Sequence, residues 1–452
     1  MFMYRYLPLI ATLVEGKPIT FGFERPYQTF IYEIALFLIS SLAFYFACKK
    51  SRLQNNIIQQ TLYQLKFFEI TPAILWGMGL IGLVIRLYNF TAGDVEYGDV
   101  GGKFLKGLDY LMYAPLCLFF SSLLNLKYSR KKLLWIYSVL IFILNITSNS
   151  RQSIIMPIGI VVILFFLYLV INNVKISAYG SPLKIFSIGI FSILLLNTLS
   201  YVSLAMLHTR KIRDNVDKIE LFQRTIETVQ DKSLMERLEI AKSQKDEEFI
   251  TYKQGWTEDY IDNFMLGRYA NMRITDETLY YAEKKGYANP QMQLFFKKGI
   301  LATFPTPFLR LFGVKLDKNT LEMSSGDMLY GKGFGGYRVT SHVGDGLATF
   351  GYWYFLIQFL AFFLVFKLLN TFVFFSKDLI KYAPFALMSV FIFLGMFRNA
   401  GGVSQDISYI LRGFLQGVFT YLVIFHLVKF LLKIINPKYT QNRKKDRQLI
   451  TD

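Results

Sequence analysis

Apolar runs of about 20 residues recur along the chain, and a long polar interval from His208 to Asp345 separates them into two groups. About 20 apolar residues in a helix cross the hydrocarbon core of a bilayer and satisfy their own backbone hydrogen bonds there. We therefore predict an all-α polytopic membrane protein of about nine spans, six before the interval and three after it. The expected spans are Gln28–Cys48, Ile70–Phe90, Gly107–Leu126, Lys132–Thr147, Ser153–Asn172, Pro182–Leu207, Leu347–Asn370, Leu379–Phe397 and Tyr409–Ile435.

Basic residues gather in alternate connections between these expected spans. Because Lys and Arg are enriched on the cytoplasmic side of membrane proteins, these connections predict which span ends lie inside. The polar interval and the N-terminus then lie outside, and the C-terminus lies inside. A further segment at Met1–Val14 would make ten spans and would place the N-terminus inside. The signal comes from Lys49, Lys50, Arg52 and Lys66, then Lys127, Arg130, Lys131 and Lys132, then Lys175 and Lys184, then Lys367, Lys377 and Lys381, and finally Arg443, Lys444, Lys445 and Arg447.

This topology divides the chain into four parts. Residues 1–207 hold the first spans, residues 208–346 form a large external helical loop, residues 347–435 hold the last spans, and residues 436–452 form a basic cytoplasmic tail. Within the loop, apolar residues at steps of three and four predict helix over Asp214–Glu248, as one helix or a hairpin packed on the membrane part. A second helical region is expected from Trp256 to Tyr281, and the glycine-rich stretch Gly326–Gly336 is expected to be a flexible loop.

The composition supports a membrane protein and argues against a nucleic-acid partner. Hydrophobic residues make up 53% of the 452 residues, and the mean hydropathy is +0.34. The net charge is +18, but 21 Lys and Arg stand against 20 Asp and Glu from His208 to Leu347. The excess positive charge therefore lies mostly on the expected cytoplasmic side, where it marks topology and attracts anionic membrane lipids.

Metal and cofactor chemistry find no support in the sequence. The two cysteines, Cys48 and Cys117, lie in apolar spans, and the three histidines form no cluster with them. Zinc sites, by contrast, combine Cys and His at short spacings. The loop also contains no Asp-x-Asp pair of the kind that holds a metal-bound nucleotide sugar. We expect neither a bound metal nor a cofactor.

Three local segments carry a resemblance to a known family. In ILNITSNSRQSI (Ile143–Ile154), small polar residues and Arg151 separate two apolar spans. GRYANMRITDETL (Gly267–Leu279) places an Arg before an aromatic residue and a small polar run. HVGDGLATFGYWYF (His342–Phe355) places an acidic residue five before a Phe-Gly pair at the start of a span. With the topology, these segments resemble the O-antigen and capsular repeat-unit polymerases, although Asp345 stands where Glu would be usual.

The resemblance implies a glycosyltransferase at the outer face of the bacterial plasma membrane. The donor would be a growing glycan on undecaprenyl pyrophosphate, and the acceptor a single lipid-linked oligosaccharide repeat unit. One glycosidic bond would form, and the pyrophosphate of the donor would leave. Besides these substrates and the membrane lipids, a chain-length regulator is a candidate partner on which the sequence is silent.

External arginines are the candidate ligands of the departing pyrophosphate. A planar guanidinium binds such oxygens with two hydrogen bonds, more specifically than an ammonium group. His342 or Asp345 would accept the proton of the acceptor hydroxyl, although Asp345 could instead cap the following helix and His342 could be a surface histidine. The candidate arginines are Arg151, Arg268, Arg273, Arg310, Arg338 and Arg398.

Two other functions remain open at this point. A ligase would move a finished glycan from the same lipid carrier to another acceptor, and it would rely more on a loop histidine such as His342. A transporter or flippase would be expected to show internal repeats and charges buried within its spans. We see no repeat in the sequence, so the polymerase is the preferred hypothesis.

Overall fold

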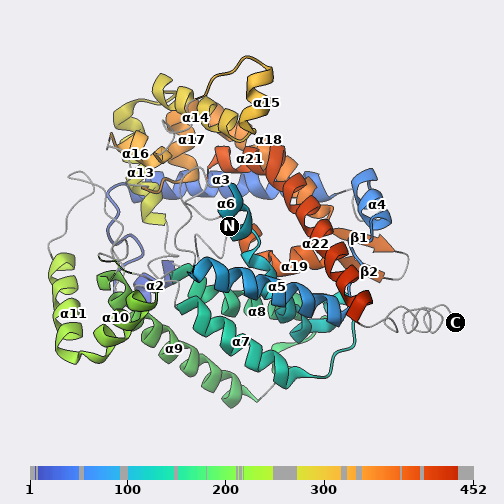
Figure 1. Ribbon diagram of the computed structural model, residues 1–452. Coiled ribbons are helices and arrows are strands. Elements are labelled where there is room, and N and C mark those ends of the chain that lie inside the picture. The colour runs from blue at the N-terminus through green and yellow to red at the C-terminus, as the bar shows by residue number, and fades with distance from the viewer. Residues whose placement is uncertain are drawn as a thin grey trace.

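The computed structural model is mainly helical (Figure 1). It describes residues 6, 9–49, 55–91, 100–146, 151–179, 181–209, 212, 216, 218–247, 272–316, 323–331, 338–376, 379–397 and 402–435. Within these residues, six helical stretches are long and apolar enough to cross a membrane. They are Pro26–Cys48, Pro72–Asn89, Phe104–Leu124, Ser153–Ile171, His342–Asn370 and Val403–Ile435. The chain therefore has the character of a multi-pass membrane protein, while the count of nine spans stays a prediction.

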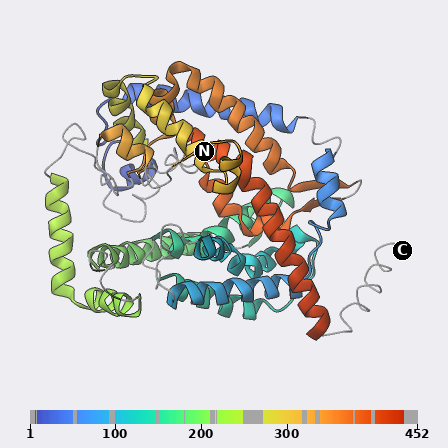
Figure 2. The same cartoon turned by 45° about the horizontal axis from the view of Figure 1, so that its top comes forward.

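The helices from α5 to α9 lie on one side of the molecule (Figures 1 and 2), and α5, η1, α7 and α8 share one apolar core with α22 (Phe414–Ile435). This part consists of α5 (Pro72–Thr91), α6 (Val100–Lys106), the 3-10 helix η1 (Asp109–Leu124), α7 (Lys131–Ile146), α8 (Arg151–Ile171), η2 (Ile176–Tyr179) and α9 (Pro182–Thr209). The helices α7 and α9 coincide with expected spans, although neither is among the six stretches named above.

Glycines bring α5 and η1 into backbone contact. A Cβ atom at Gly82 would lie 2.1 Å from the backbone nitrogen of Met112, and one at Gly79 would lie 2.3 Å from Pro115. Helices in membranes associate through such small residues, because lipid supplies no hydrophobic force between them. Pro115 lies inside η1, and the non-helical backbone angles of Phe120 (φ −118°, ψ 52°) divide η1 into two 3-10 segments joined by a kink. The expected span Gly107–Leu126 is therefore helical but kinked.

The remaining long helices carry a helical cap at one end. The long helices here are α3 (Pro26–Cys48), α18 (Tyr354–Asn370) and α22 (Phe414–Ile435). Directly before α22 come α21 (Val403–Ser408) and the π-helix η6 (Tyr409–Gly413). The cap, as we call it below, consists of α13 (Met272–Lys285), α14 (Pro290–Ala302), α15 (Thr306–Leu311), α16 (Ser325–Tyr330) and α17 (His342–Phe350). The short η5 (Gly351–Trp353) joins α17 to α18, so the cap continues directly into a span. At the N-terminal end, α2 (Leu9–Val14) precedes α3.

The region Asp214–Glu248 forms two helices, α10 (Lys218–Gln230) and α11 (Lys232–Glu247). Asp231 separates them, and its carboxylate accepts hydrogen bonds from the backbone nitrogen of Leu234 at 3.0 Å and from the hydroxyl of Ser233 at 2.8 Å. The contact of α10 with α9 includes a hydrogen bond of 3.0 Å between the hydroxyls of Thr209 and Thr225. The region thus forms two helices that meet at an angle rather than one continuous helix, with α11 at the edge of the molecule (Figure 2).

The expected span Leu379–Phe397 is wrong as a single helix. Its first residues form strand β2 (Leu379–Tyr382), which pairs antiparallel with β1 (Val373–Ser376) in the register Val373 with Tyr382. Pro384 then begins the short helix α19 (Pro384–Met388), and α20 (Val390–Gly395) follows after a break at Ser389. An apolar run of this kind suits a strand as well as a helix, and periodicity does not distinguish the two.

Two smaller features complete the fold. The helix α4 (Ile57–Gln64) lies beside the strand pair of β1 and β2. Asn55, just before α4, exchanges two hydrogen bonds with the backbone of Phe375 in β1. The stretch Gly326–Gly336, expected as a flexible loop, instead begins within α16. Ser324 caps this helix, since its hydroxyl accepts a hydrogen bond from the backbone nitrogen of Asp327 at 3.1 Å. Capping of this kind favours helix despite the glycine.

Candidate functional site

The cap is fastened to the beginning of α3 by one buried carboxylate. Asp276 on α13 is fully buried, and it accepts hydrogen bonds from the backbone nitrogens of Glu24 at 2.7 Å and Arg25 at 3.0 Å. The hydroxyl of Thr29 donates a third hydrogen bond at 2.7 Å. A negative charge beside the first backbone N–H groups of a helix is favourable, because these groups have no partner within the helix. Asp276 on α13 thus caps the beginning of α3, although the two lie far apart in the sequence.

A second set of buried polar contacts follows on the same helix. Arg273 is 2% exposed, and its Nε donates to the carbonyl of Gly22 at 3.0 Å. Thr275 donates at 2.6 Å to Glu33, a carboxylate on α3 that is 1% exposed. The guanidinium of Arg273, predicted as a pyrophosphate ligand, therefore lies inside the junction between the cap and the N-terminal segment.

His342 occupies the first turn of α17. Ser341 caps this helix by accepting a hydrogen bond from the backbone nitrogen of Gly344 at 2.9 Å. The imidazole is fully buried, with its Nε2 3.3 Å from the carbonyl oxygen of Met396 and its ring 5.9 Å from that of Phe362 on α18. The alternative of a histidine on the surface is thereby wrong.

Asp345 lies one turn further along α17 and is 5% exposed. Its carboxylate is hydrogen-bonded to the side chain of Ser325 on α16. On another side lies Gly402, where a Cβ atom would stand 3.1 Å from Oδ2. Because Gly402 has no side chain, the space beside the carboxylate of Asp345 is larger than it would be with any other residue at position 402. Asp345 and His342 share α17, as predicted, but they contact different neighbours.

The helices α13 and α17 cross at very short distance. A Cβ atom at Gly344 would lie 2.3 Å from the side chain of Thr278 and 2.9 Å from its backbone carbonyl carbon. The close crossing sets the buried polar residues of α13 against the first turns of α17. The crossing point lies between His342 and Asp345 on α17, whereas Arg273 faces Gly22 from the beginning of α13.

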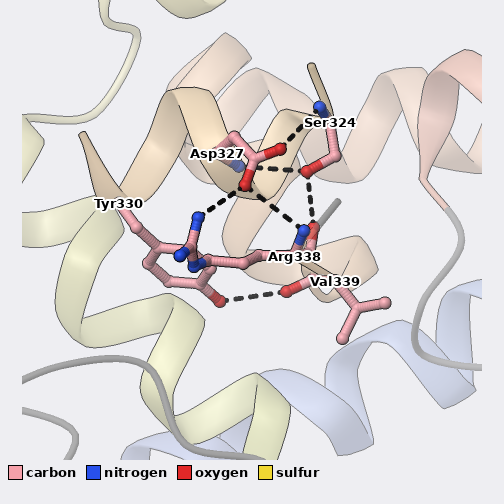
Figure 3. A network of polar contacts seen from close by, with 5 residues as sticks. All are labelled: Ser324, Asp327, Tyr330, Arg338 and Val339. Atoms are coloured by element: carbon pink, nitrogen blue, oxygen red, sulfur yellow. Dashed lines mark hydrogen bonds and ion pairs between the residues drawn. The ribbon is translucent and has the colours of Figure 1, made fainter. Parts of the chain in front are cut away.

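Arg338 enters an ion pair with a buried carboxylate in the cap (Figure 3). Its Nη1 lies 2.9 Å from Oδ1 of Asp327, which is fully buried. Ser324 connects the same two residues, because its backbone nitrogen donates to Asp327 at 3.1 Å and its hydroxyl donates to the carbonyl of Arg338 at 2.7 Å. Tyr330 adds a hydrogen bond of 3.1 Å to the carbonyl of Val339. The charge of Arg338 is thus partly compensated by Asp327.

The Asp327 network predicts a specific dependence of stability on pH. Burial raises the pKa of Asp327, but hydrogen bonds from Ser324 and Arg338 outweigh it and hold the pKa below its ordinary value. A carboxyl with a lowered pKa stabilises the fold fully above its unfolded pKa, about 3.9. This stabilisation is lost as the pH falls through the folded pKa. In Asp327→Asn, the melting temperature should therefore fall less steeply with decreasing pH in the acid range than in the wild-type protein. Thermal unfolding at a series of pH values measures this dependence. The same dependence in both proteins would contradict the network.

The other predicted arginines lie elsewhere or outside the described residues. Arg310 is exposed in the last turn of α15, at the outer edge of the cap. Arg151 begins α8, in the other half of the molecule, and the structure describes only its backbone. Arg268 and Arg398 fall outside the described residues. Arg273, Arg338, His342 and Asp345 thus lie in or beside the helices of the cap, each with its own neighbours, and the role of all the candidate residues stays a prediction.

A charged cluster within the first spans was missed by the sequence reasoning. Arg86 on α5 lies 3.1 Å from Asp109, at the beginning of η1, and 3.4 Å from the side chain of Asn145 on α7. Asn89 donates to Asp109 at 3.0 Å, and Asn145 donates to Tyr113 at 3.2 Å. Charged residues within membrane spans are rare and mark functional or structural sites. A single Arg inside an otherwise apolar run was the signal that could have found it.

This cluster predicts strong coupling between its two charges. Removing one partner of an ion pair leaves an uncompensated charge, and removing both is less harmful. Arg86 and Asp109 are 16% and 18% exposed, so the cost is smaller than for a fully buried pair. We expect Arg86→Met to lower the free energy of unfolding by about 1–3 kcal/mol, and Arg86→Met with Asp109→Asn to lower it by less. A double-variant cycle on the purified protein measures the difference. Additive effects of the two changes would show that the pair contributes nothing.

The cap boundary offers a proton acceptor in a shielded position. In a site from which water is largely excluded, oriented charges act more strongly than in water. A carboxylate there can accept the proton of a hydroxyl nucleophile, and arginines near it can hold an anionic leaving group. Among the described residues, no group of three or more His, Cys, Asp or Glu side chains is arranged to hold a metal ion.

Comparison of the chain with protein-family models, with curated proteins and with solved structures found no match.

Proposed function

We propose that this chain is a membrane glycosyltransferase that polymerises oligosaccharide repeat units carried on polyprenyl pyrophosphate at the outer face of the membrane. The observation that carries the proposal is the position of Asp345. A nearly enclosed carboxylate lies at the start of a helix that continues into a span, with a polar helical cap beside it. Such a place suits substrates that have a polar sugar head and an apolar polyprenyl tail.

The proposed reaction joins two lipid-linked glycans in one step. A hydroxyl oxygen of the acceptor attacks the anomeric carbon of the donor sugar and forms the new glycosidic bond. The bond from that carbon to the pyrophosphate oxygen breaks, and the pyrophosphate keeps the electron pair. Asp345 accepts the proton of the acceptor hydroxyl, while arginine side chains stabilise the charge that develops on the leaving group.

Three features support this proposal together. The sequence segments around Arg151, Arg273 and Asp345 resemble those of repeat-unit polymerases. The several apolar helices suit an enzyme whose substrates reside in the membrane. The close crossing of α13 and α17 joins the helix that carries Arg273 to the helix that carries Asp345, so both segments of the resemblance belong to one part of the fold.

The ligase remains the alternative, and the surface glycan of a deletion strain distinguishes the two. Loss of a polymerase leaves single repeat units attached to the surface acceptor, whereas loss of a ligase leaves none. We expect single units, and restoration of long chains by the wild-type gene. Absence of all units would favour the ligase, and unchanged chain lengths would contradict both. A tag within the cap should also be accessible from outside intact cells, and cytosolic accessibility would contradict the proposed topology.

A further inference from the structure

Residues 290–316, which form α14, α15 and their flanks, differ in charge from the rest of the polar interval. They contain four basic residues, Lys297, Lys298, Arg310 and Lys315, and neither Asp nor Glu. The interval as a whole is nearly balanced, with 21 basic and 20 acidic residues. We name residues 290–316 the elbow. Its uniform positive charge suits an anionic partner.

The elbow also exposes large apolar side chains. Leu311 is 82% exposed, Phe312 70% and Phe308 45%, whereas Leu309 between them is 4% exposed and anchors α15 to the cap. The ring of Phe308 lies 5.5 Å from that of Phe304 and 5.0 Å from that of Phe312, so the rings form a row along α15. Basic residues beside an exposed aromatic row are typical of helices that lie in a membrane interface.

Direct contacts place the elbow beside the beginning of the last span. Arg412 in η6 donates to the carbonyl of Thr303 at 3.1 Å, and the hydroxyl of Thr303 lies 3.1 Å from that of Ser408 at the end of α21. Figures 1 and 2 both show α15 next to this part of the chain. The apolar row therefore lies near the level at which the last span begins.

The beginning of the last span also exposes apolar side chains. Leu411 is 41% exposed, and Leu415 and Phe419 on α22 are 64% and 69% exposed. In a membrane protein, such residues on a spanning helix face the lipid chains. Aromatic residues are enriched at the level of the headgroups, and basic residues attract anionic lipids there.

We propose that the elbow is immersed in the interfacial layer of the outer leaflet, with its aromatic row at the boundary of the acyl chains and its basic residues among anionic phospholipid headgroups. This part of the polar interval would then lie in the membrane surface rather than in the aqueous space. The interfacial position rests on the membrane character of the chain, and the choice of the outer leaflet rests on the proposed topology. The inference therefore holds or fails independently of the proposed reaction.

Fluorescence quenching in vesicles tests the inference on the full-length protein. An environment-sensitive fluorophore is attached to Phe312→Cys in a Cys48→Ser background, where Cys117, at 1% exposed, stays unreactive. The control is Ile240→Cys on α11, an apolar residue that is 56% exposed on a polar helix. We expect a nitroxide near the lipid headgroup to quench position 312 several-fold more than position 240. Aqueous iodide should give the opposite order.

The charge of the interface is tested by lipid composition. With phosphatidylglycerol in the vesicles, Arg310→Glu with Lys315→Glu should lower the nitroxide quenching at position 312, whereas in pure phosphatidylcholine this double change should have little effect. Iodide quenching at position 312 equal to that at position 240 would overturn the inference, since the elbow would face water. Protection of position 312 from both quenchers would also overturn it, because a second protein surface would then cover the elbow.

Discussion

Asp345→Asn is expected to lower the rate of glycan polymerisation by about 10²–10⁴-fold, the usual contribution of a general base. Asparagine has nearly the same shape as aspartate but does not accept a proton from a sugar hydroxyl. The contact with Ser325 can be kept, since the remaining carbonyl oxygen still accepts a hydrogen bond. The rate is measured on purified protein, together with thermal unfolding to show that the variant is folded.

Two further variants separate catalysis from folding. Asp231→Asn changes a carboxylate at the junction between α10 and α11. Asparagine also caps a helix well, so this variant should keep wild-type activity. Gly402→Ala leaves the carboxylate in place but sets a methyl group 3.1 Å from Oδ2 of Asp345. We expect it to slow polymerisation by narrowing the space beside the base. Wild-type activity of folded Asp345→Asn would remove Asp345 from the mechanism.

Asp276→Ala is expected to have the largest effect on stability, a decrease of about 3–5 kcal/mol in the free energy of unfolding. The change leaves the backbone nitrogens of Glu24 and Arg25 and the hydroxyl of Thr29 without their acceptor. Each unsatisfied donor in a buried position costs about 1–3 kcal/mol. The measurement is thermal or chemical unfolding of the purified protein in lipid nanodiscs. The cap should also become more susceptible to protease, because its attachment to α3 is lost.

Graded variants show whether the individual hydrogen bonds are responsible. Thr29→Val removes one of the three donors and should cost about 1 kcal/mol. Asp276→Asn keeps one acceptor oxygen, so its effect should lie between those of Thr29→Val and Asp276→Ala. If Asp276→Ala unfolds like the wild-type protein, Asp276 is not the residue that fastens the cap.

The spans that the sequence predicted well are those whose apolar runs are uninterrupted. Gln28–Cys48 corresponds to α3, Ile70–Phe90 to α5, and Ser153–Asn172 to α8, each within a few residues. The length and hydropathy of such a run are sufficient, because a helix satisfies its own backbone hydrogen bonds. The run Leu379–Phe397 was wrong because its first residues find hydrogen-bonding partners in a neighbouring strand. Local composition does not show that partner.

The candidate site could be predicted only where its residues share a helix. His342 and Asp345 lie on α17 as expected, because three residues span about one turn. The contact between Asp276 and α3 joins residues that are 247 to 252 positions apart, and no local pattern indicates it. In the same way, the ion pair between Arg338 and Asp327 depends on the fold of α16. The partners of these buried carboxylates were therefore visible only in the structure.

The proposed reaction is tested most directly by the purified full-length protein in vesicles, supplied with polyprenyl-pyrophosphate oligosaccharide that carries a fluorescent label. The wild-type protein should produce a ladder of glycans and should release one polyprenyl pyrophosphate for each bond formed. Asp345→Asn should leave single labelled units. Labelled units that stay single with the wild-type protein, or that cross the vesicle membrane without being joined, would contradict the account.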